Sequence, residues 1–141
     1  MTSGQPGVQP GEPRLLGKAE LLGLLRRADA IGARPGAADL DGGLWTLRNE
    51  LFRSLPFWAA SAGLLEGPAE SGIVLYLGAR EGLPGYFPSV LVLDLAVGRY
   101  SVRTWDVGRS SFTGSEIATA SPLVCGPPCD GSDLVIRITR P

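Results

Sequence analysis

Histidine is absent from all 141 residues of this sequence. A chain without histidine has no imidazole general acid or base, no Ser-His-Asp or Cys-His nucleophile and no imidazole metal ligand. We therefore predict no catalytic residue, no metal site and no cofactor. Carboxylates could still carry acid–base chemistry, although none sits in a motif that enforces the separation such chemistry needs. A small carboxylate-dependent hydrolase stays as a less favoured alternative, in which Asp94, Asp106 or Glu116 would have to converge on one pocket.

The sequence also lacks an excess of charge of either sign. Thirteen basic residues stand against fourteen acidic ones, which leaves a net charge of −1, and no run of lysine or arginine is present. We therefore expect no nucleic-acid partner. No apolar run reaches the roughly eighteen residues of a membrane helix, so no membrane partner is expected.

The N-terminus shows no charged segment followed by an apolar one, so no secretion signal is visible. The localisation stays unknown: the chain as it stands would be cytoplasmic, and it would be extracellular if it belongs to a secreted parent. The oligomeric state stays open at this point.

Only two cysteines are present, in the segment Cys125-Gly-Pro-Pro-Cys129. Their spacing around a stiff turn is compatible with a local disulfide. Two free thiols in a loop are the equal alternative. A closed zinc site would need two further ligands, and a redox motif would be one residue shorter.

Composition divides the chain into a tail and one folded unit. Residues 1–13 hold glycine, proline, glutamine and serine with almost no apolar side chain, which predicts a disordered tail. Residues 14–141 are long enough for one core and too short for two domains, so we predict a single domain. Its helical part spans 14–60 and its β-sandwich part spans 72–141.

Two helices are expected in the N-terminal part. The segment from Lys18 to Ile31 repeats apolar residues at the three- and four-residue spacing of an amphipathic helix. A second helix is expected from about residue 44, with Pro56 ending or kinking it. The leucines that would share one face of this second helix are Leu44, Leu47, Leu51 and Leu55.

The C-terminal part changes to short apolar or alternating runs between glycine, proline and serine. Such runs predict strands. The expected strands are 73–77, 90–95, 99–107, 116–120 and 134–138, with a tight hairpin at 96–98 and a turn at 108–115. The predicted fold class is α+β, with two N-terminal helices followed by a small antiparallel β-sandwich or half-barrel.

Aromatic residues supply the candidate ligand-binding side chains. Tyr86 and Phe87 lie in a Gly/Pro loop, and Trp105 lies in the strand expected at 99–107. Aromatic rings beside Asp, Arg or Ser are typical of a sugar-binding face. The competing interpretation for Trp105 is core packing, and for Tyr86 and Phe87 the two interpretations are balanced.

Several segments together resemble the C-terminal end of apiosidase-like glycoside hydrolases. They are LRNELFRSLPFW (47–58), GIVLYLG (72–78), LVLDLAVGRYSVRTWDVGRSSFTG (91–114) and DLVIRI (133–138). In that family a catalytic barrel is followed by a β-sandwich described as a collagen-binding domain. The barrel strands that would carry the catalytic carboxylates have no counterpart here.

The resemblance implies a non-catalytic accessory or binding module, with carbohydrate as its ligand or a catalytic domain as its partner. A structural or protein–protein interaction module is the alternative.

Overall fold

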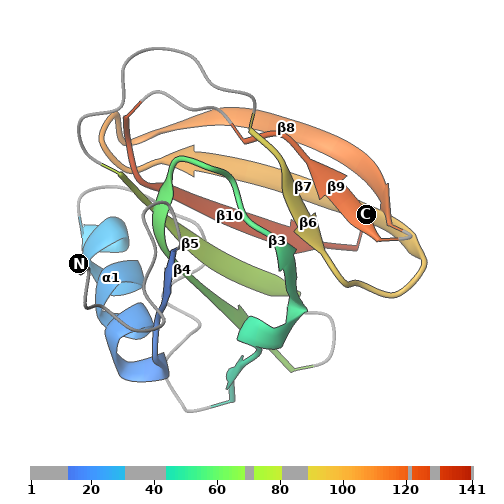
Figure 1. The fold of residues 1–141 in the computed structure, drawn as a ribbon, viewed down its shortest axis with the longest axis horizontal. Coiled ribbons are helices and arrows are strands. Elements are labelled where there is room, and N and C mark those ends of the chain that lie inside the picture. Colours follow the sequence, from blue (N-terminus) through green and yellow to red (C-terminus); the bar gives the residue numbers. More distant parts are fainter. Residues whose placement is uncertain are drawn as a thin grey trace, which may run out of the picture.

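The computed structural model describes residues 13–30, 44–68, 72–80, 89–120, 122–127 and 131–140. Over these ranges the chain is mostly β, with two sheets, one α-helix and one short 3-10 helix (Figure 1). The helices are α1 (Lys18–Ala30) and η2 (Asn49–Leu51). The strands are β1 (Arg14–Leu15), β2 (Thr46–Leu47), β3 (Phe52–Ser54), β4 (Ala59–Glu66), β5 (Ile73–Ala79), β6 (Leu91–Leu93), β7 (Gly98–Asp106), β8 (Ser111–Ala120), β9 (Leu123–Cys125) and β10 (Leu134–Thr139).

The larger sheet has the order β1-β4-β5-β10-β7-β8, and β2 pairs with β4. Its strands are antiparallel, except that β1 runs parallel to β4. The last strand, β10, lies between β5 and β7 in the middle of this sheet. The smaller sheet has the order β3-β6-β9.

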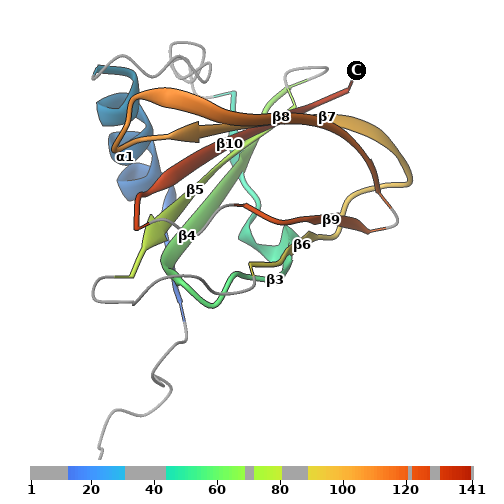
Figure 2. The ribbon, with the colours of Figure 1, turned by 90° about the horizontal axis from the view of Figure 1, so that it is seen from above.

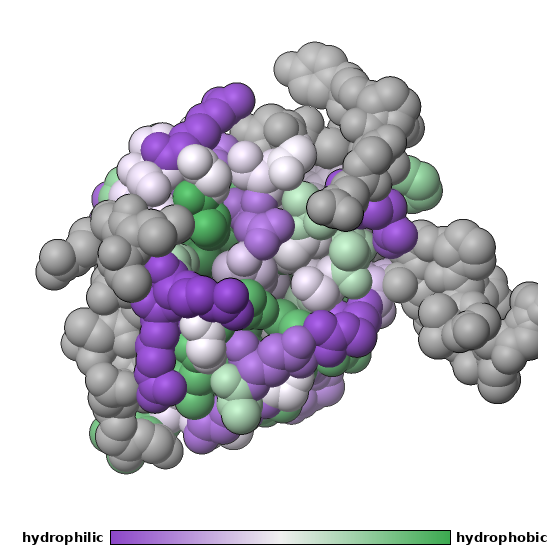
Figure 3. Space-filling model, turned by 90° about the vertical axis from the view of Figure 1, so that its left-hand side faces the viewer, coloured by the Kyte–Doolittle hydropathy of each residue, from purple (hydrophilic) through white to green (hydrophobic). Residues whose placement is uncertain are grey.

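The helix α1 and the smaller sheet lie on opposite sides of the larger sheet (Figure 2). Leu21, Leu25 and Ala28 form the buried face of α1. They pack against the side chains on the α1 side of the larger sheet, namely Leu65, Val74, Tyr76, Trp105 and Val135. The side of the molecule on which α1 lies shows many hydrophilic side chains, as expected where an amphipathic helix turns its polar face to water (Figure 3).

The second core lies between the two sheets. Alternation along β5 serves both cores, because Leu75 and Leu77 face the smaller sheet while Val74 and Tyr76 face α1. Six of the seven residues of β5 are therefore buried. The smaller sheet contributes Leu91, Leu93 and Leu123 to this core.

A glycine allows α1 to approach the larger sheet closely. A Cβ atom on Gly63 of β4 would lie 2.9 Å from Leu21 Cδ2 and 3.0 Å from Leu16 Cβ. Both distances are shorter than ordinary carbon–carbon contacts. The sequence Ala-Gly-Leu-Leu in β4 thus leaves room for the helix.

The predicted second helix is wrong, and so is the α+β fold class, because the described residues are mostly β with one α-helix; the two sheets do form the expected β-sandwich-like arrangement. Residues 44–55 instead form β2, η2 and β3. Trp45 and Leu47 pack on the α1 side of the larger sheet, whereas Leu51 and Leu55 pack between the sheets. A single helix could not place these side chains in both cores. The segment therefore passes from one face of the larger sheet to the other, although its leucines have helical spacing.

The predicted first helix corresponds to α1, and strands form at all five predicted positions, four of them close to the expected bounds. The hairpin predicted at 96–98 is wrong, because β6 belongs to the smaller sheet and β7 to the larger one. The turn predicted at 108–115 is shorter, since β8 already begins at Ser111. The strand β4 was not predicted. Residues 1–12 of the predicted tail lie outside the described residues.

Candidate functional site

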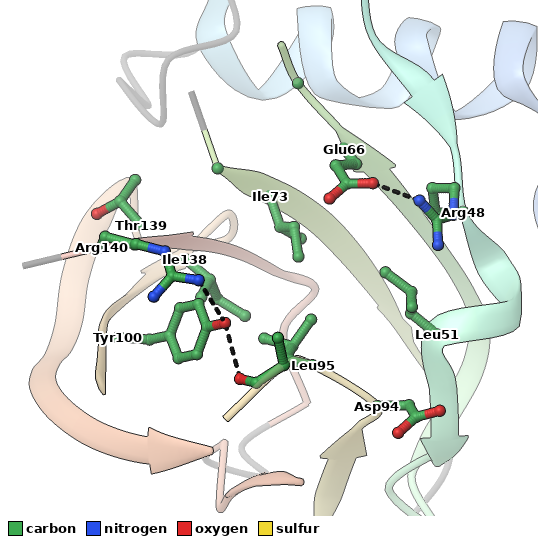
Figure 4. A pocket seen from close by; sticks show the side chains of 13 residues that line it. Arg48, Leu51, Glu66, Ile73, Asp94, Leu95, Tyr100, Ile138, Thr139 and Arg140 are labelled. Atoms are coloured by element: carbon green, nitrogen blue, oxygen red, sulfur yellow. Dashed lines mark hydrogen bonds and ion pairs between the residues drawn. The ribbon is translucent and has the colours of Figure 1, made fainter. Parts of the chain in front are cut away.

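A hollow of about 400 Å³ opens at one end of the space between the two sheets (Figure 4). Residues of the larger sheet, of the segment around η2 and of the segment that follows β6 contribute to it. Its lining residues are Arg48, Leu51, Glu66, Gly67, Gly72, Ile73, Asp94, Leu95, Ala96, Tyr100, Ile138, Thr139 and Arg140. We call it the end pocket.

One side of the end pocket carries an ion pair. Arg48 Nη1 lies 2.5 Å from Glu66 Oε1, and Arg48 Nε lies 2.6 Å from Glu50 Oε2. The backbone N–H of Arg48 donates to Leu64 O at 2.9 Å, which holds this residue beside β4. The hydrogen bond with Glu50 is the largest cause that raises the pKa of Arg48, and the charge of Glu66 adds to it. The guanidinium is therefore a fixed positive charge at the rim.

Asn49 fixes the segment that presents Arg48. Its Nδ2 donates to Leu16 O at 2.8 Å, and its Oδ1 accepts from the backbone N–H of Leu64 at 2.9 Å. A single amide thus satisfies both a backbone acceptor and a backbone donor next to the larger sheet. These two hydrogen bonds connect η2 to Leu16 and to Leu64 of β4.

The opposite side of the end pocket is formed by Tyr100 and Arg140 (Figure 4). The Tyr100 hydroxyl donates to Ala96 O at 2.9 Å. The Arg140 guanidinium carbon lies 5.0 Å from the centre of the Tyr100 ring, a cation–π distance. Its Nη2 also lies 3.5 Å from the phenol oxygen.

Asp94 and an apolar lining complete the end pocket. The backbone N–H of Asp94 donates to Leu51 O at 2.8 Å, and its side chain is exposed. Gly72 has a φ of +81°, and a Cβ there would lie 2.2 Å from Ile138 O, so only glycine fits this position of the wall. The apolar side chains of the lining are Leu51, Ile73, Leu95 and Ile138.

The end pocket therefore combines two guanidiniums, two carboxylates and one phenol with an apolar interior. Guanidiniums only donate hydrogen bonds and carboxylates only accept them. The charges of Arg48 and Arg140 balance those of Glu66 and Asp94. Such a set can bind a small polar molecule by hydrogen bonds while the apolar residues cover its carbon surface.

Of the three predicted ligand-binding residues, Trp105 lies in the part of the chain that the structure describes. Trp105 is 6% exposed and lies on the α1 side of the larger sheet, away from the end pocket. Its ring meets that of Phe112 edge to face at 4.6 Å between centres. Tyr86 and Phe87 lie outside the described residues, so their role stays a prediction.

Cys125 is buried at the end of β9. Burial, and after it the charge of Glu116, raises the pKa of this thiol to about 11. Cys129 lies outside the described residues, so the disulfide between the two stays a prediction.

The three carboxylates considered for a hydrolase lie in different places. Asp94 lines the end pocket, while Glu116 lines a separate hollow of about 310 Å³ between β8 and β9. Asp106 is fully buried and caps a turn, since its Oδ1 accepts from the backbone N–H of Arg109 at 2.9 Å. No group of three or more acidic or cysteine side chains that could hold a metal ion occurs in the described ranges.

Comparison with known proteins gives no relative: no family model, no curated protein and no solved structure matches this chain. Within the part of the chain that the structure describes, no helix is long and apolar enough to cross a membrane.

Sequence reasoning did not find the end pocket because its polar residues come from five separate segments. Arg48 precedes η2, Glu66 ends β4, Asp94 follows β6, Tyr100 lies in β7 and Arg140 follows β10. No spacing in the sequence relates these positions. The sheet order, which places β10 between β5 and β7, brings Glu66, Tyr100 and Arg140 to one end of the sheet. Backbone hydrogen bonds from Arg48 to Leu64 O and from Asp94 to Leu51 O hold the other two residues there.

Proposed function

We propose that this protein is a non-catalytic binding module and that the end pocket holds a neutral sugar residue. The observation that carries the proposal is the balanced set of donors and acceptors around an apolar lining, provided by Arg48, Glu66, Asp94 and Arg140. The size supports it as well. A hollow of about 400 Å³ lies within the range of about 300–1,000 Å³ that is typical of small-molecule sites.

The pairing of donors with acceptors favours hydroxyl groups as the recognised chemistry. A hydroxyl both donates and accepts, so one sugar hydroxyl can accept from a guanidinium and donate to a neighbouring carboxylate. Arg48 and Glu66 already offer such a pair at 2.5 Å. Hydrogen bonds to charged groups are the stronger ones, which gives the site orientation as well as affinity.

The charge balance argues against an ionic ligand. A phosphate or carboxylate ligand would meet Asp94 and Glu66 as well as the two arginines, and a cation would meet the reverse arrangement. The ligand must also have an apolar surface that covers the apolar interior of the end pocket. The C–H surface of a sugar ring can lie on Leu51 and Ile138 while its hydroxyls reach the rim.

The carboxylates at the rim are better suited to binding than to hydrolysis. Glu66 is held by Arg48, and Asp94 stands on the far side of the lining at the rim (Figure 4). The resemblance of residues 47–58, 72–78, 91–114 and 133–138 to the accessory β-sandwich of apiosidase-like glycoside hydrolases supports a module that works beside a catalytic domain. That domain would act on the glycan that this module binds.

A glycan array followed by calorimetry of the best-bound free sugar tests the proposal. Arg140→Ala should weaken binding roughly tenfold, because a charge-assisted hydrogen bond is lost. Arg99→Ala is the matched control, since Arg99 is exposed, neighbours Tyr100 in β7 and does not line the end pocket. Equal losses in both variants, or no binding to any glycan at millimolar concentration, would refute the proposal.

A further inference from the structure

The strand β8 forms an open edge of the larger sheet. It pairs with β7 along its length, and no strand pairs with its other edge within the ranges that the structure describes. Residues 111–117 of β8 are all exposed. Unpaired N–H and C=O groups of an edge strand are a template for another strand.

Natural edge strands are commonly protected by lysine, proline or very short length. The sequence of β8, SFTGSEIATA, is ten residues long and contains no lysine, arginine or proline. Its one charged residue is Glu116. The edge of the smaller sheet differs, because β9 is only three residues long.

A register shift divides β8 into two parts. Phe112 pairs with Trp105 and Gly114 pairs with Thr104, so Thr113 is an extra residue at a bulge. From Gly114 to Ala120 each residue has a regular partner in β7. The regular part is therefore seven residues long, and its middle residue is Ile117.

Ile117 is the exposed apolar side chain of this regular part. It is 51% exposed and lies opposite Ser101 of β7. An exposed isoleucine at the middle of an unprotected edge is in position to pack against a second strand that pairs there.

We propose that this strand is the β8 of a second copy of the chain, paired antiparallel about a two-fold axis at Ile117. A two-fold interface uses the same surface of both copies, and the regular part of β8 is centred on the proposed axis. Ile117 then packs on Ile117 of the second copy. Glu116 faces Ala118, and Ser115 faces Thr119.

Charge selects this register and permits the association. A register centred one residue earlier would place Glu116 opposite Glu116, and like charges directly opposite each other are destabilising. The chain has a net charge of −1, so two copies repel each other only weakly. The contact is small, so the dimer forms and separates with protein concentration.

Disulfide trapping tests the register. In a Cys129→Ser background, Ile117→Cys should form a crosslinked dimer under mild oxidation, because opposite Cα atoms in an antiparallel pair lie about 4.5–5.5 Å apart, within disulfide range. Ser115→Cys should not, because its copies lie four residues apart along the paired strands. A crosslink in Ser115→Cys without one in Ile117→Cys would overturn the proposal.

Sedimentation velocity over a range of concentrations tests the association itself. The sedimentation coefficient of the unmodified chain should rise with concentration, and Ile117→Lys should abolish this rise. Val97→Lys is the matched control, because Val97 is 77% exposed and lies outside β8, just before the residue of β7 that pairs with Ala120. Circular dichroism establishes that both variants are folded. A chain that stays monomeric at all concentrations, or a Val97→Lys variant that loses the rise equally, would overturn the proposal.

Discussion

The guanidinium of Arg140 lies against the ring of Tyr100, with 5.0 Å from its central carbon to the ring centre. Arg140 follows β10 and Tyr100 belongs to β7, so this contact joins two neighbouring strands at the mouth of the end pocket. The Tyr100 hydroxyl meanwhile donates to Ala96 O. One aromatic side chain thus positions both the wall of the pocket and the segment that leads into β7.

Tyr100→Phe separates the ring from its hydroxyl. The variant keeps the ring under Arg140 and loses the hydrogen bond to Ala96 O, which should lower the free energy of unfolding by about 1 kcal/mol. The affinity for sugar should fall roughly fivefold, because the segment at Ala96 lines the pocket and becomes less fixed. Urea unfolding and calorimetry measure the two effects. Unchanged stability would show that the hydroxyl does not hold this segment.

Asn49→Ala should be more destabilising than its partial exposure suggests. It leaves Leu16 O and the backbone N–H of Leu64 without their partner, and we expect a loss of about 2–4 kcal/mol in the free energy of unfolding. Ser54→Ala, an exposed position of nearby β3, is the control and should change it by less than about 0.5 kcal/mol. Similar denaturation midpoints for both variants would contradict the bridging role of Asn49.

Replacing each of two glycines by alanine should change the free energy of unfolding in opposite directions. Gly63→Ala places a Cβ 2.9 Å from Leu21 Cδ2, so α1 has to shift and the free energy of unfolding should fall by about 1–3 kcal/mol. Gly23→Ala meets nothing within 4 Å in the middle of α1 and should raise it by about 0.5–1 kcal/mol. Thermal or urea unfolding of both variants measures this difference. A stabilising Gly63→Ala would mean that α1 does not pack closely on β4.

The Cys125 thiol should make stability depend on alkaline pH. Its pKa rises from 9.0 to about 11 in the folded chain, so the folded state holds the proton more tightly than the unfolded state. The stabilisation is complete below pH 9 and is lost as the pH rises from 9 through 11. Urea unfolding across this range, in a Cys129→Ser background, should show a decline that Cys125→Ala reduces.

Thiol labelling gives an independent measurement of the same site. In the Cys129→Ser background at pH 8, a disulfide reagent should react slowly with Cys125 in the folded chain and rapidly in urea, because the folded thiol is buried and protonated. Equal labelling rates in both states would show that this end of β9 is open to solvent.

The sequence predicts those elements whose side chains face one core or alternate between two. The apolar stripe of α1 has a single face, and the apolar run at 73–77 corresponds to β5, which is covered on both sides. The segment 44–55 is misleading because its leucines keep helical spacing while it turns around the sheet. The first half of β8 has no apolar alternation at all, since its residues are exposed on an edge and only pairing with β7 makes it a strand.

The end pocket could not be predicted for a different reason. Its rim residues are ordinary surface residues by type, and their proximity depends on β10 lying between β5 and β7. The aromatic residue that lines it, Tyr100, lies in β7, which corresponds to the strand predicted at 99–107. Its pairing with Arg140 across two neighbouring strands carries no local signal in the sequence.

Chemical-shift mapping by NMR tests the central claim most directly. The isotope-labelled chain is titrated with the free sugar that binds best on the glycan array. The account predicts that shifts concentrate on the amides of Asp94, Ala96, Tyr100 and Thr139 at the end pocket. Shifts centred on the outer face around Trp105 and Phe112, with the end pocket unaffected, would contradict it.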